Sequence, residues 1–131
     1  PVGRASTIKM IRSVLVKGIE ALTAECFGAA TIAGVADEVA ASLDASQTKD
    51  SWNDQAAYNM ERMTTHGIRR AAEMREVAIT LADLNIPGRM TAGTIAWQDQ
   101  LGNLGLSLLD TEGLEPRLSA IHTALDAQKS G

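Results

Sequence analysis

A long stretch without helix breakers, residues 3–34, constrains the fold of this chain more than any other feature. It contains no proline and no pair of glycines, and apolar residues recur along it at steps of three and four: Ile8, Ile11, Val14, Leu15, Ile19, Leu22, Cys26 and Ala30. This spacing is the period of an α-helix. Ser6 or Thr7 offers a cap at its start and Gly34 a stop, so the sequence predicts one helix over residues 6–33. At 1.5 Å per residue that helix would be about 40 Å long.

One side of this predicted helix is polar. At about 100° per residue, Lys9, Ser13 and Glu20 project close together, which holds a lysine one turn before a hydroxyl. The opposite side carries Ile11, Val14, Gly18 and Leu22. A solvated face with ordinary charge spacing is the common explanation of such a pattern. A functional lysine–hydroxyl pair is the other explanation, and the pattern alone leaves both open.

The length, composition and net charge of the chain limit the classes of protein to which it can belong. The chain has 131 residues, enough for one domain with a core, and a net charge of −4. Basic residues do not cluster as a nucleic-acid footprint requires, and no apolar run is long enough to cross a membrane. The single cysteine, Cys26, cannot form an internal disulfide, and its place in the apolar pattern predicts a small core residue. No leader pattern is visible, and we expect a cytoplasmic protein.

Further helical patterns follow the long helix, and none of the chain alternates with a period of two. The predicted helices are residues 36–43, 51–65, 67–85, 90–102 and 114–128, with a short helical piece at 104–109. His66-Gly67 is expected to interrupt or bend the pattern. The helix at 67–85 is expected to bury Ile68, Ala71, Ala72, Val77, Ile79, Leu81 and Leu84. The sequence therefore predicts an all-α helical bundle built on one long N-terminal helix, as a single domain over residues 1–131.

Motifs for metal and nucleotide binding are missing from the sequence. The only histidines, His66 and His122, lie far apart, and there is no HExxH, paired CxxC or calcium-loop spacing. There is also no GxGxxG and no GxxxxGK[ST]. We therefore expect neither a metal site nor a nucleotide site in this chain.

A charged cluster, His66 to Glu76, is the second candidate for function. On a helix Arg69 meets Glu73 at i+4, and His66 lies one turn before Arg69 and Arg70. A row of surface ion pairs, each worth about 0.3–0.5 kcal/mol, explains this spacing. Arginine forks also match carboxylates and phosphates, so an anion-binding site explains it too. Both interpretations stay open at the level of sequence.

Two blocks of the chain resemble a known family. In the first, Gly3, Lys9 and Glu25 fall at the offsets of the opening helix of the C-terminal domain in the 6-phosphogluconate dehydrogenase-like, or β-hydroxyacid dehydrogenase, superfamily. In the second, AAEMREVAITLADLNIP at residues 71–87 is similar to that family's amphipathic helix, which ends in a short loop at a proline. The resemblance covers residues 3–100.

The resemblance implies roles for particular residues. In that family an N-terminal Rossmann domain, absent from this chain, binds NAD or NADP, and the lysine is the general acid/base, a role that would belong to Lys9. Ser13 stands where the family has a substrate-orienting asparagine. The family's lysine–aspartate pair falls near Ala72-Glu73, so Arg69 or Arg70, with His66, would replace its basic function as substrate contacts. Family members pair through this domain, which implies a homodimer.

These observations lead to one expected function and two alternatives. We expect the C-terminal substrate-binding and dimerisation domain of an NAD(P)-dependent oxidoreductase acting on a small hydroxyacid, inactive without its nucleotide-binding domain. The first alternative is a non-catalytic helical dimerisation or interaction module whose polar stripe faces water. The second is a stand-alone protein that binds small acids, which requires Arg69 and Arg70 to converge on a pocket.

Overall fold

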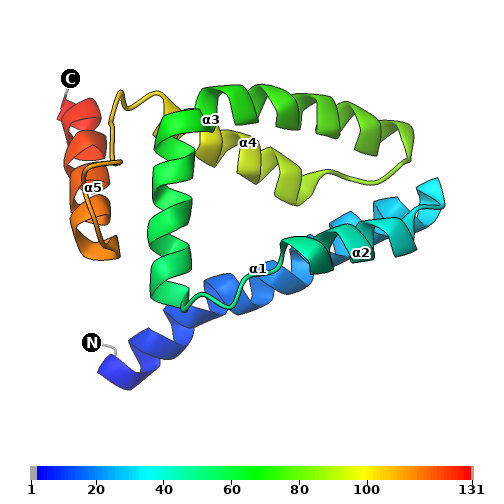
Figure 1. Ribbon diagram of the computed structural model, residues 1–131, viewed down its shortest axis with the longest axis horizontal. Coiled ribbons are helices and arrows are strands. Elements are labelled where there is room, and N and C mark those ends of the chain that lie inside the picture. Colours follow the sequence, from blue (N-terminus) through cyan, green and yellow to red (C-terminus); the bar gives the residue numbers. More distant parts are fainter. Residues whose placement is uncertain (1–2, 131) are drawn as a thin grey trace. The chain divides into compact units, whose positions relative to one another are not determined.

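The computed structural model describes residues 3–130, and within them the chain forms five α-helices and no strand (Figure 1). The helices are α1 (Arg4–Ala33), α2 (Ala36–Ser46), α3 (Trp52–Asp83), α4 (Arg89–Gly102) and α5 (Leu114–Ser130). The prediction of an all-α fold with a long N-terminal helix is confirmed. The helices divide between two compact units, residues 3–46 with 80–90, and residues 47–79 with 91–130. The single domain over residues 1–131 stays a prediction.

The two ends of α1 are built differently. The predicted cap at Ser6 or Thr7 is wrong: the helix starts at Arg4, with Gly3 as its N-cap and no side-chain cap. The reason is that the Thr7 hydroxyl donates to the Gly3 carbonyl at 3.1 Å, one turn back, instead of accepting from a free N–H. Gly34 ends the helix as predicted, with a left-handed φ of 76° that favours glycine.

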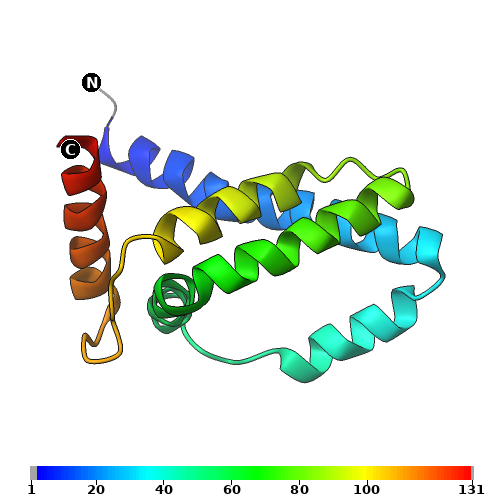
Figure 2. The ribbon, with the colours of Figure 1, turned by 90° about the horizontal axis from the view of Figure 1, so that it is seen from above.

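The first unit has little buried surface. The chain reverses at Gly34, and α2 diverges from α1 as it runs back (Figure 2). Only Ala29 and Ala30 of α1 are buried, and α2 buries no residue. Cys26 is exposed, so its predicted place in the core is wrong. The apolar stripe of α1 is longer than the part of the helix that the unit covers, and Cys26 belongs to the uncovered part.

Glu25 ties α1 to the start of α4 within the first unit. Its Oε1 atom accepts the backbone N–H of Met90, the second residue of α4, at 2.9 Å. A carboxylate at this point satisfies one of the free N–H groups at the helix start and opposes the positive end of its dipole. Glu25, which the family resemblance singled out, therefore has a structural role as a helix cap.

Helix α3 is one continuous 32-residue helix, not the two helices predicted on either side of His66-Gly67. The backbone stays helical through His66-Gly67, and Figure 1 shows that α3 changes direction part-way along its length. At its start the Ser51 hydroxyl accepts the N–H of Asp54 at 3.1 Å, which is an N-cap. Glycine ends many helices, but α3 continues through Gly67 because a neighbouring helix packs against it there.

That neighbour is α4, which runs back beside the second half of α3 (Figures 1 and 2). The two backbones touch at Gly67 and Gly102. A Cβ atom on Gly67 would lie 2.2 Å from the carbonyl oxygen of Gln98, and one on Gly102 would lie 2.5 Å from the nitrogen of Ile68. Glycine is therefore required at both positions, and an ion pair between Arg75 and Asp99 joins the same two helices.

The core of the second unit lies between α3, α4 and α5. Its buried members are Leu101, Leu108 and Ile121, and the partly buried residues packed on them are Met60, Met63, Leu104, Leu106, Ala120 and Leu125. The predicted helical piece at 104–109 is wrong, since residues 105–108 have no helical assignment. Leucines at every second position reach the core from this loop, and Gly105 adopts a left-handed φ of 69° that a helix excludes.

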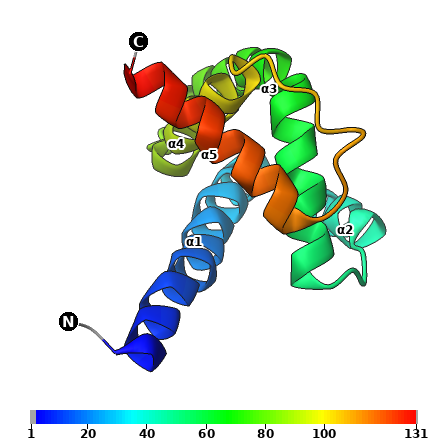
Figure 3. The ribbon, with the colours of Figure 1, turned by 90° about the vertical axis from the view of Figure 1, so that its left-hand side faces the viewer.

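Arg117 fastens the start of α5. Its Nε donates to the carbonyl of Thr111 and its Nη1 to the carbonyl of Ala57, both at 2.6 Å. Figure 3 shows the first turns of α5 beside the first half of α3, where this contact lies. Pro116 sits in the first turn of α5, as predicted. The sequence analysis missed Arg117, because arginines that bind carbonyls leave no periodic signal.

Several residues expected to be buried on the second half of α3 are not. Ala71 and Leu81 are buried and Leu84 is partly buried, as predicted. The exposed residues are Ile68, Ala72, Val77 and Ile79. A helix that packs on one side buries a single stripe, and Ile68, Ala72 and Ile79 fall outside it. Val77 lies between Leu81 and Leu84 around the helix axis and is nevertheless 39% exposed.

Candidate functional site

A buried carboxylate organises the charged cluster on α3. Glu61 is only 5% exposed, and its Oε1 accepts from Arg62 Nε at 2.8 Å and Arg62 Nη2 at 2.7 Å. Its Oε2 accepts from the Thr65 hydroxyl. Burying a carboxylate is costly unless it is paired and hydrogen-bonded, and both conditions hold here.

The same contacts keep Glu61 ionised. Burial by itself would raise the pKa of this carboxyl group. The hydrogen bonds from Thr65 and Arg62, together with the positive charges of Arg62 and His66, outweigh burial and leave the pKa below the ordinary value of 4.5. Near neutral pH the cluster therefore contains one fixed, satisfied negative charge.

Arg62 is held from two sides. Its guanidinium group forms an ion pair with Glu61. The central carbon of the same group lies 5.7 Å from the centre of the Tyr58 ring, within cation–π range. The three residues lie along the first half of α3, so their positions relative to one another are set by one helix. An arginine fixed in this way presents a pre-oriented positive charge.

His66 lies one turn beyond Arg62 and is partly buried. Its pKa lies below the ordinary 6.5, first because of burial and then because of three nearby guanidinium groups, those of Arg62, Arg69 and Arg70; Glu61 opposes the effect. The electrostatic environment of this imidazole is thus net positive. An anion that binds beside it would be attracted, and would in turn make His66 easier to protonate.

The two arginines that follow His66, Arg69 and Arg70, differ in their contacts and exposure. Arg69 forms the predicted i+4 ion pair with Glu73, with 3.2 Å between Nη1 and Oε1, and both side chains are more than half exposed. Such pairs contribute little stability. Arg70 is partly buried and forms no ion pair or hydrogen bond within residues 3–130. Arg70, beside His66, is therefore the guanidinium with free donors for a ligand.

Lys9 and Ser13 belong to the other compact unit and are described apart from this cluster. Ser13 Oγ donates to the backbone carbonyl of Lys9 at 3.0 Å, so the hydroxyl proton is occupied within α1 while its lone pairs stay available. Lys9 is exposed and has no carboxylate within ion-pair distance among residues 3–130. The structure thus brings Lys9 and Ser13 together, and His66, Arg69 and Arg70 together, on two separate helices.

Sequence reasoning missed Glu61 and Arg62, which are the most ordered part of the cluster. A signal was present: Arg62, His66 and Arg69 repeat at steps of four and three, so the charged stripe starts one turn earlier than predicted. The burial of Glu61 leaves no such trace, because an isolated glutamate on a helix normally faces water.

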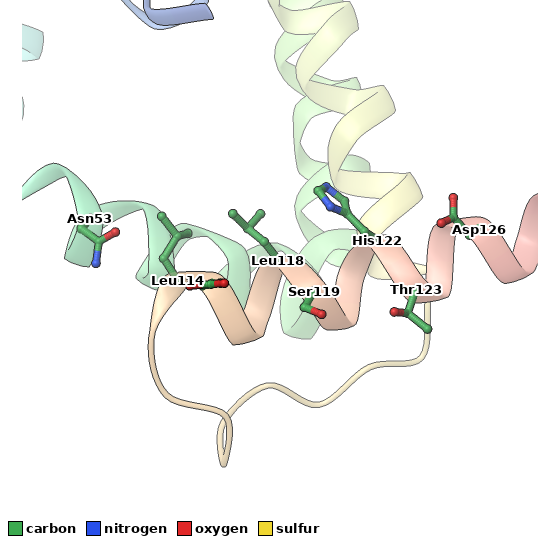
Figure 4. Close-up of a pocket in the computed structure, with 8 residues that line it drawn as sticks. Asn53, Leu114, Leu118, Ser119, His122, Thr123 and Asp126 are labelled. Atoms are coloured by element: carbon green, nitrogen blue, oxygen red, sulfur yellow. The ribbon is translucent and has the colours of Figure 1, made fainter. Parts of the chain in front are cut away.

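A groove on α5 is a second candidate site. It has a volume of about 470 Å³ and is lined by Asn53, Leu114, Glu115, Leu118, Ser119, His122, Thr123 and Asp126. Figure 4 shows His122 and Leu118 on one side of α5, with Ser119 and Thr123 on the other. Because His122 and Ser119 point apart, they do not form a nucleophile–base pair.

Within residues 3–130 no group of three or more histidine, cysteine, aspartate or glutamate side chains could hold a metal ion. None of the helices in this part of the chain combines the length and apolar character that a bilayer crossing requires.

Comparison with known proteins gives one family and one solved relative. Residues 30–101, which include all of α3 and all of α4 except its last residue, match the family described as Domain of unknown function (DUF1932). A crystal structure of a conserved hypothetical protein from Sinorhizobium meliloti 1021 has 32% sequence identity and a TM-score of 0.50 over 93% of this chain. The chain spans 42% of the length of that relative. No curated protein matches the chain.

Proposed function

Because the chain belongs to the DUF1932 family, we propose that it is the C-terminal substrate-binding and dimerisation domain of an NAD(P)-dependent oxidoreductase that acts on a small hydroxyacid. The domain of this family is known as the C-terminal helical domain of 6-phosphogluconate dehydrogenase-like proteins. That match, over 72 of 131 residues (30–101), is the observation that carries the proposal. The longer relative from Sinorhizobium meliloti 1021 is compatible with a further domain in the complete protein.

In this proposal the cluster on α3 binds the substrate carboxylate. Arg70 has free donors and is partly buried, and His66 lies one turn before it. A guanidinium fork binds a carboxylate through two parallel hydrogen bonds. Arg69 adds positive charge but shares it with Glu73, so its contribution to binding is smaller.

Lys9 is the proposed acid/base of the reaction. An exposed amine on a long helix can exchange a proton with a substrate oxygen once a second domain encloses that side of α1. Ser13 would contribute an acceptor, because its proton is already donated to the Lys9 carbonyl. The family's asparagine also has a donor that Ser13 lacks here, so a water or a different substrate group would replace it.

In this proposal a Rossmann domain outside the described residues binds NAD or NADP. A Rossmann site is built on a strand followed by a glycine-rich turn, and residues 3–130 contain no strand. A cytoplasmic homodimer is part of the same proposal.

Proton NMR of the two histidines tests the substrate-binding part. Small hydroxyacids, added at constant pH to the chain, are expected to shift the imidazole signals of His66 and to raise its pKa, since a bound carboxylate offsets the surrounding guanidinium charges. His122, on α5, is the internal control and should not respond. Arg70→Ala should abolish the response, whereas Arg69→Ala should reduce it only partly.

Equal shifts at both histidines, or a response that survives Arg70→Ala, would contradict specific binding at this cluster. The exposed apolar side of α1 favours a second candidate function, a non-catalytic interaction module. That candidate predicts pairing of the chain without any response of His66 to acids.

A further inference from the structure

Arg62 has a second guanidinium edge that the proposed substrate contacts do not use. Its Nε and Nη2 atoms both lie against Oε1 of Glu61, at 2.8 and 2.7 Å. The remaining nitrogen, Nη1, forms no hydrogen bond or ion pair within residues 3–130. A guanidinium group has five N–H donors. The edge formed by Nη1 and the second hydrogen of Nη2 is therefore free for a ligand.

This free edge is open to solvent. The Arg62 side chain is 25% exposed. Among the buried and partly buried residues that the structure describes, only Gln98 has a side-chain polar atom that is both sealed from solvent and without a partner. Arg62, His66 and Arg70 are all partly buried. Their unpaired nitrogens are thus within reach of a ligand.

The free edge of Arg62 is also held in place. Buried Glu61 fixes the other side of the guanidinium group, and the Tyr58 ring centre lies 5.7 Å from its central carbon. The Arg69 side chain, by contrast, is 63% exposed. A ligand that binds Arg62 meets a donor whose freedom is already restricted, and pre-organisation of this kind increases affinity. Arg62 is therefore a better second contact than Arg69.

His66 lies between two guanidinium groups with free donors. Arg62 precedes it by four residues and Arg70 follows it by four, so the three residues lie on successive turns, about 6 Å apart along the helix axis. The positive charges of both arginines lower the pKa of His66, so both guanidinium groups are within electrostatic reach of the imidazole. Two guanidinium forks on either side of one imidazole match a ligand with two acidic groups.

The cluster can balance two carboxylates. The ion pairs of Arg62 and Arg69 with their glutamates are neutral, and Arg70 supplies one positive charge. His66 supplies a second positive charge when it is protonated. The charged groups that shift the pKa of His66, Glu61 included, all belong to α3. A second bound carboxylate offsets the guanidinium charges among them, so it favours the protonated imidazole.

We propose that the substrate is a hydroxyacid with two carboxylates, one bound by Arg70 and the other by the free edge of Arg62, with His66 between them. The inference rests on the proposed function and specifies its substrate class. A carboxylate accepts two parallel hydrogen bonds from a guanidinium fork, which both arginines can offer. Arg62 is then the residue that selects a diacid over the corresponding monoacid.

Malate and lactate test the proposal, because these two 2-hydroxyacids differ by one carboxylate. Calorimetric titration of the chain at pH 7 is expected to give a dissociation constant at least about tenfold lower for malate than for lactate. In proton NMR, malate should move the His66 signals further toward those of the protonated imidazole than lactate does. Inorganic phosphate, a single group with more than one charge, should bind no more tightly than lactate.

Arg62→Lys tests which residue binds the second carboxylate. Lysine keeps a positive charge beside Glu61 but has no second edge of donors, so the advantage of malate should disappear while lactate binds as before. Arg75→Lys, in another arginine–carboxylate pair of α3, is the matched control and should keep the advantage. If Arg62→Lys does not fold, Glu61→Gln with Arg62→Gln removes the pair without leaving a buried charge, and the same loss is expected.

Three results would overturn the proposal and leave the proposed function intact, provided that lactate shifts the signals of His66. They are equal affinities for malate and lactate, an advantage of malate that survives Arg62→Lys, and phosphate binding as tight as that of malate. If neither acid shifts His66, the proposed substrate site fails together with the inference.

Discussion

Glycine occurs both where α3 contacts α4 and on the exposed side of α1, but only in the first place does it have close neighbours. At Gly67 and Gly102 two helix backbones touch, and any side chain would collide with backbone atoms. At Gly18 the space beside the helix is empty. The first region is completed by the chain itself, whereas the second has the composition of a helix contact without the second helix. A glycine inside a helix therefore does not by itself predict a close helix contact in this chain, because the same residue type is essential at Gly67 and unconstrained by neighbours at Gly18.

The largest expected effect comes from breaking the completed contact. Gly67→Ala places a Cβ atom against the Gln98 carbonyl, and backbone atoms cannot move aside as a flexible side chain would. We expect a loss of about 3 kcal/mol or more in the free energy of unfolding, measured by urea denaturation. Gly93→Ala in α4, where nothing lies within 4 Å, is the control and should be neutral or stabilising.

Removing the anchor of α5 is expected to have the next largest effect. Arg117→Ala leaves the carbonyls of Thr111 and Ala57 without their charged donor and frees the start of the helix. A loss of about 2–3 kcal/mol is expected from thermal or urea unfolding. Lys129→Ala, at the exposed end of the same helix, should change the stability by less than about 0.5 kcal/mol. Similar losses of unfolding free energy in both variants would show that Arg117 does not anchor α5.

Glu61→Gln is expected to cost about 1–3 kcal/mol at pH 7, because Arg62 and Thr65 lose a charged partner. The folded-state pKa of Glu61 lies below its ordinary 4.5, so its stabilising effect is complete above pH 4.5 and is lost as the pH falls below that value. Unfolding curves at several pH values should therefore converge for the two proteins in acid. Glu73→Gln, on an exposed ion pair, should show a much smaller difference throughout.

The smallest effect, with the opposite sign, is expected at Gly18. In conditions where the chain is monomeric, Gly18→Ala should increase the helicity of α1 and stabilise it by up to about 1 kcal/mol, since the added methyl group meets no atom. Circular dichroism and hydrogen exchange of α1 would measure this gain. A loss of helicity in the monomer would mean that Gly18 already has a neighbour, and the contrast with Gly67 would fail.

Much of the fold follows from the sequence, for reasons visible in particular residues. Gly34 ends α1 where predicted because only glycine adopts its left-handed backbone easily. His66-Gly67 predicted a disturbance, yet the backbone of α3 stays helical through these residues, and the helix changes direction part-way along its length (Figure 1). The difference arises from α4, whose approach turns a helix-breaking glycine into a contact. The loop at 104–109 was misjudged because its leucines serve a core built from distant segments.

The candidate site was less predictable than the fold. The ion pair of Arg69 with Glu73 follows from helical spacing, which acts over a single turn. The free state of Arg70 and the burial of Glu61 depend on what packs over α3, and no local pattern records that. The exposure of Cys26 was missed for a related reason. An apolar pattern predicts which side of a helix can form contacts, but it does not show whether another segment of this chain packs against that side.

The most direct test of the account concerns the polar side of α1. The proposed function predicts that Lys9→Ala in the complete protein lowers the turnover of a small hydroxyacid about a hundredfold or more and leaves the binding of NAD or NADP and the proposed dimer unchanged. Lys17→Ala, an exposed lysine of the same helix, should leave turnover near normal. Near-normal turnover in Lys9→Ala would contradict the proposed role of α1 in catalysis.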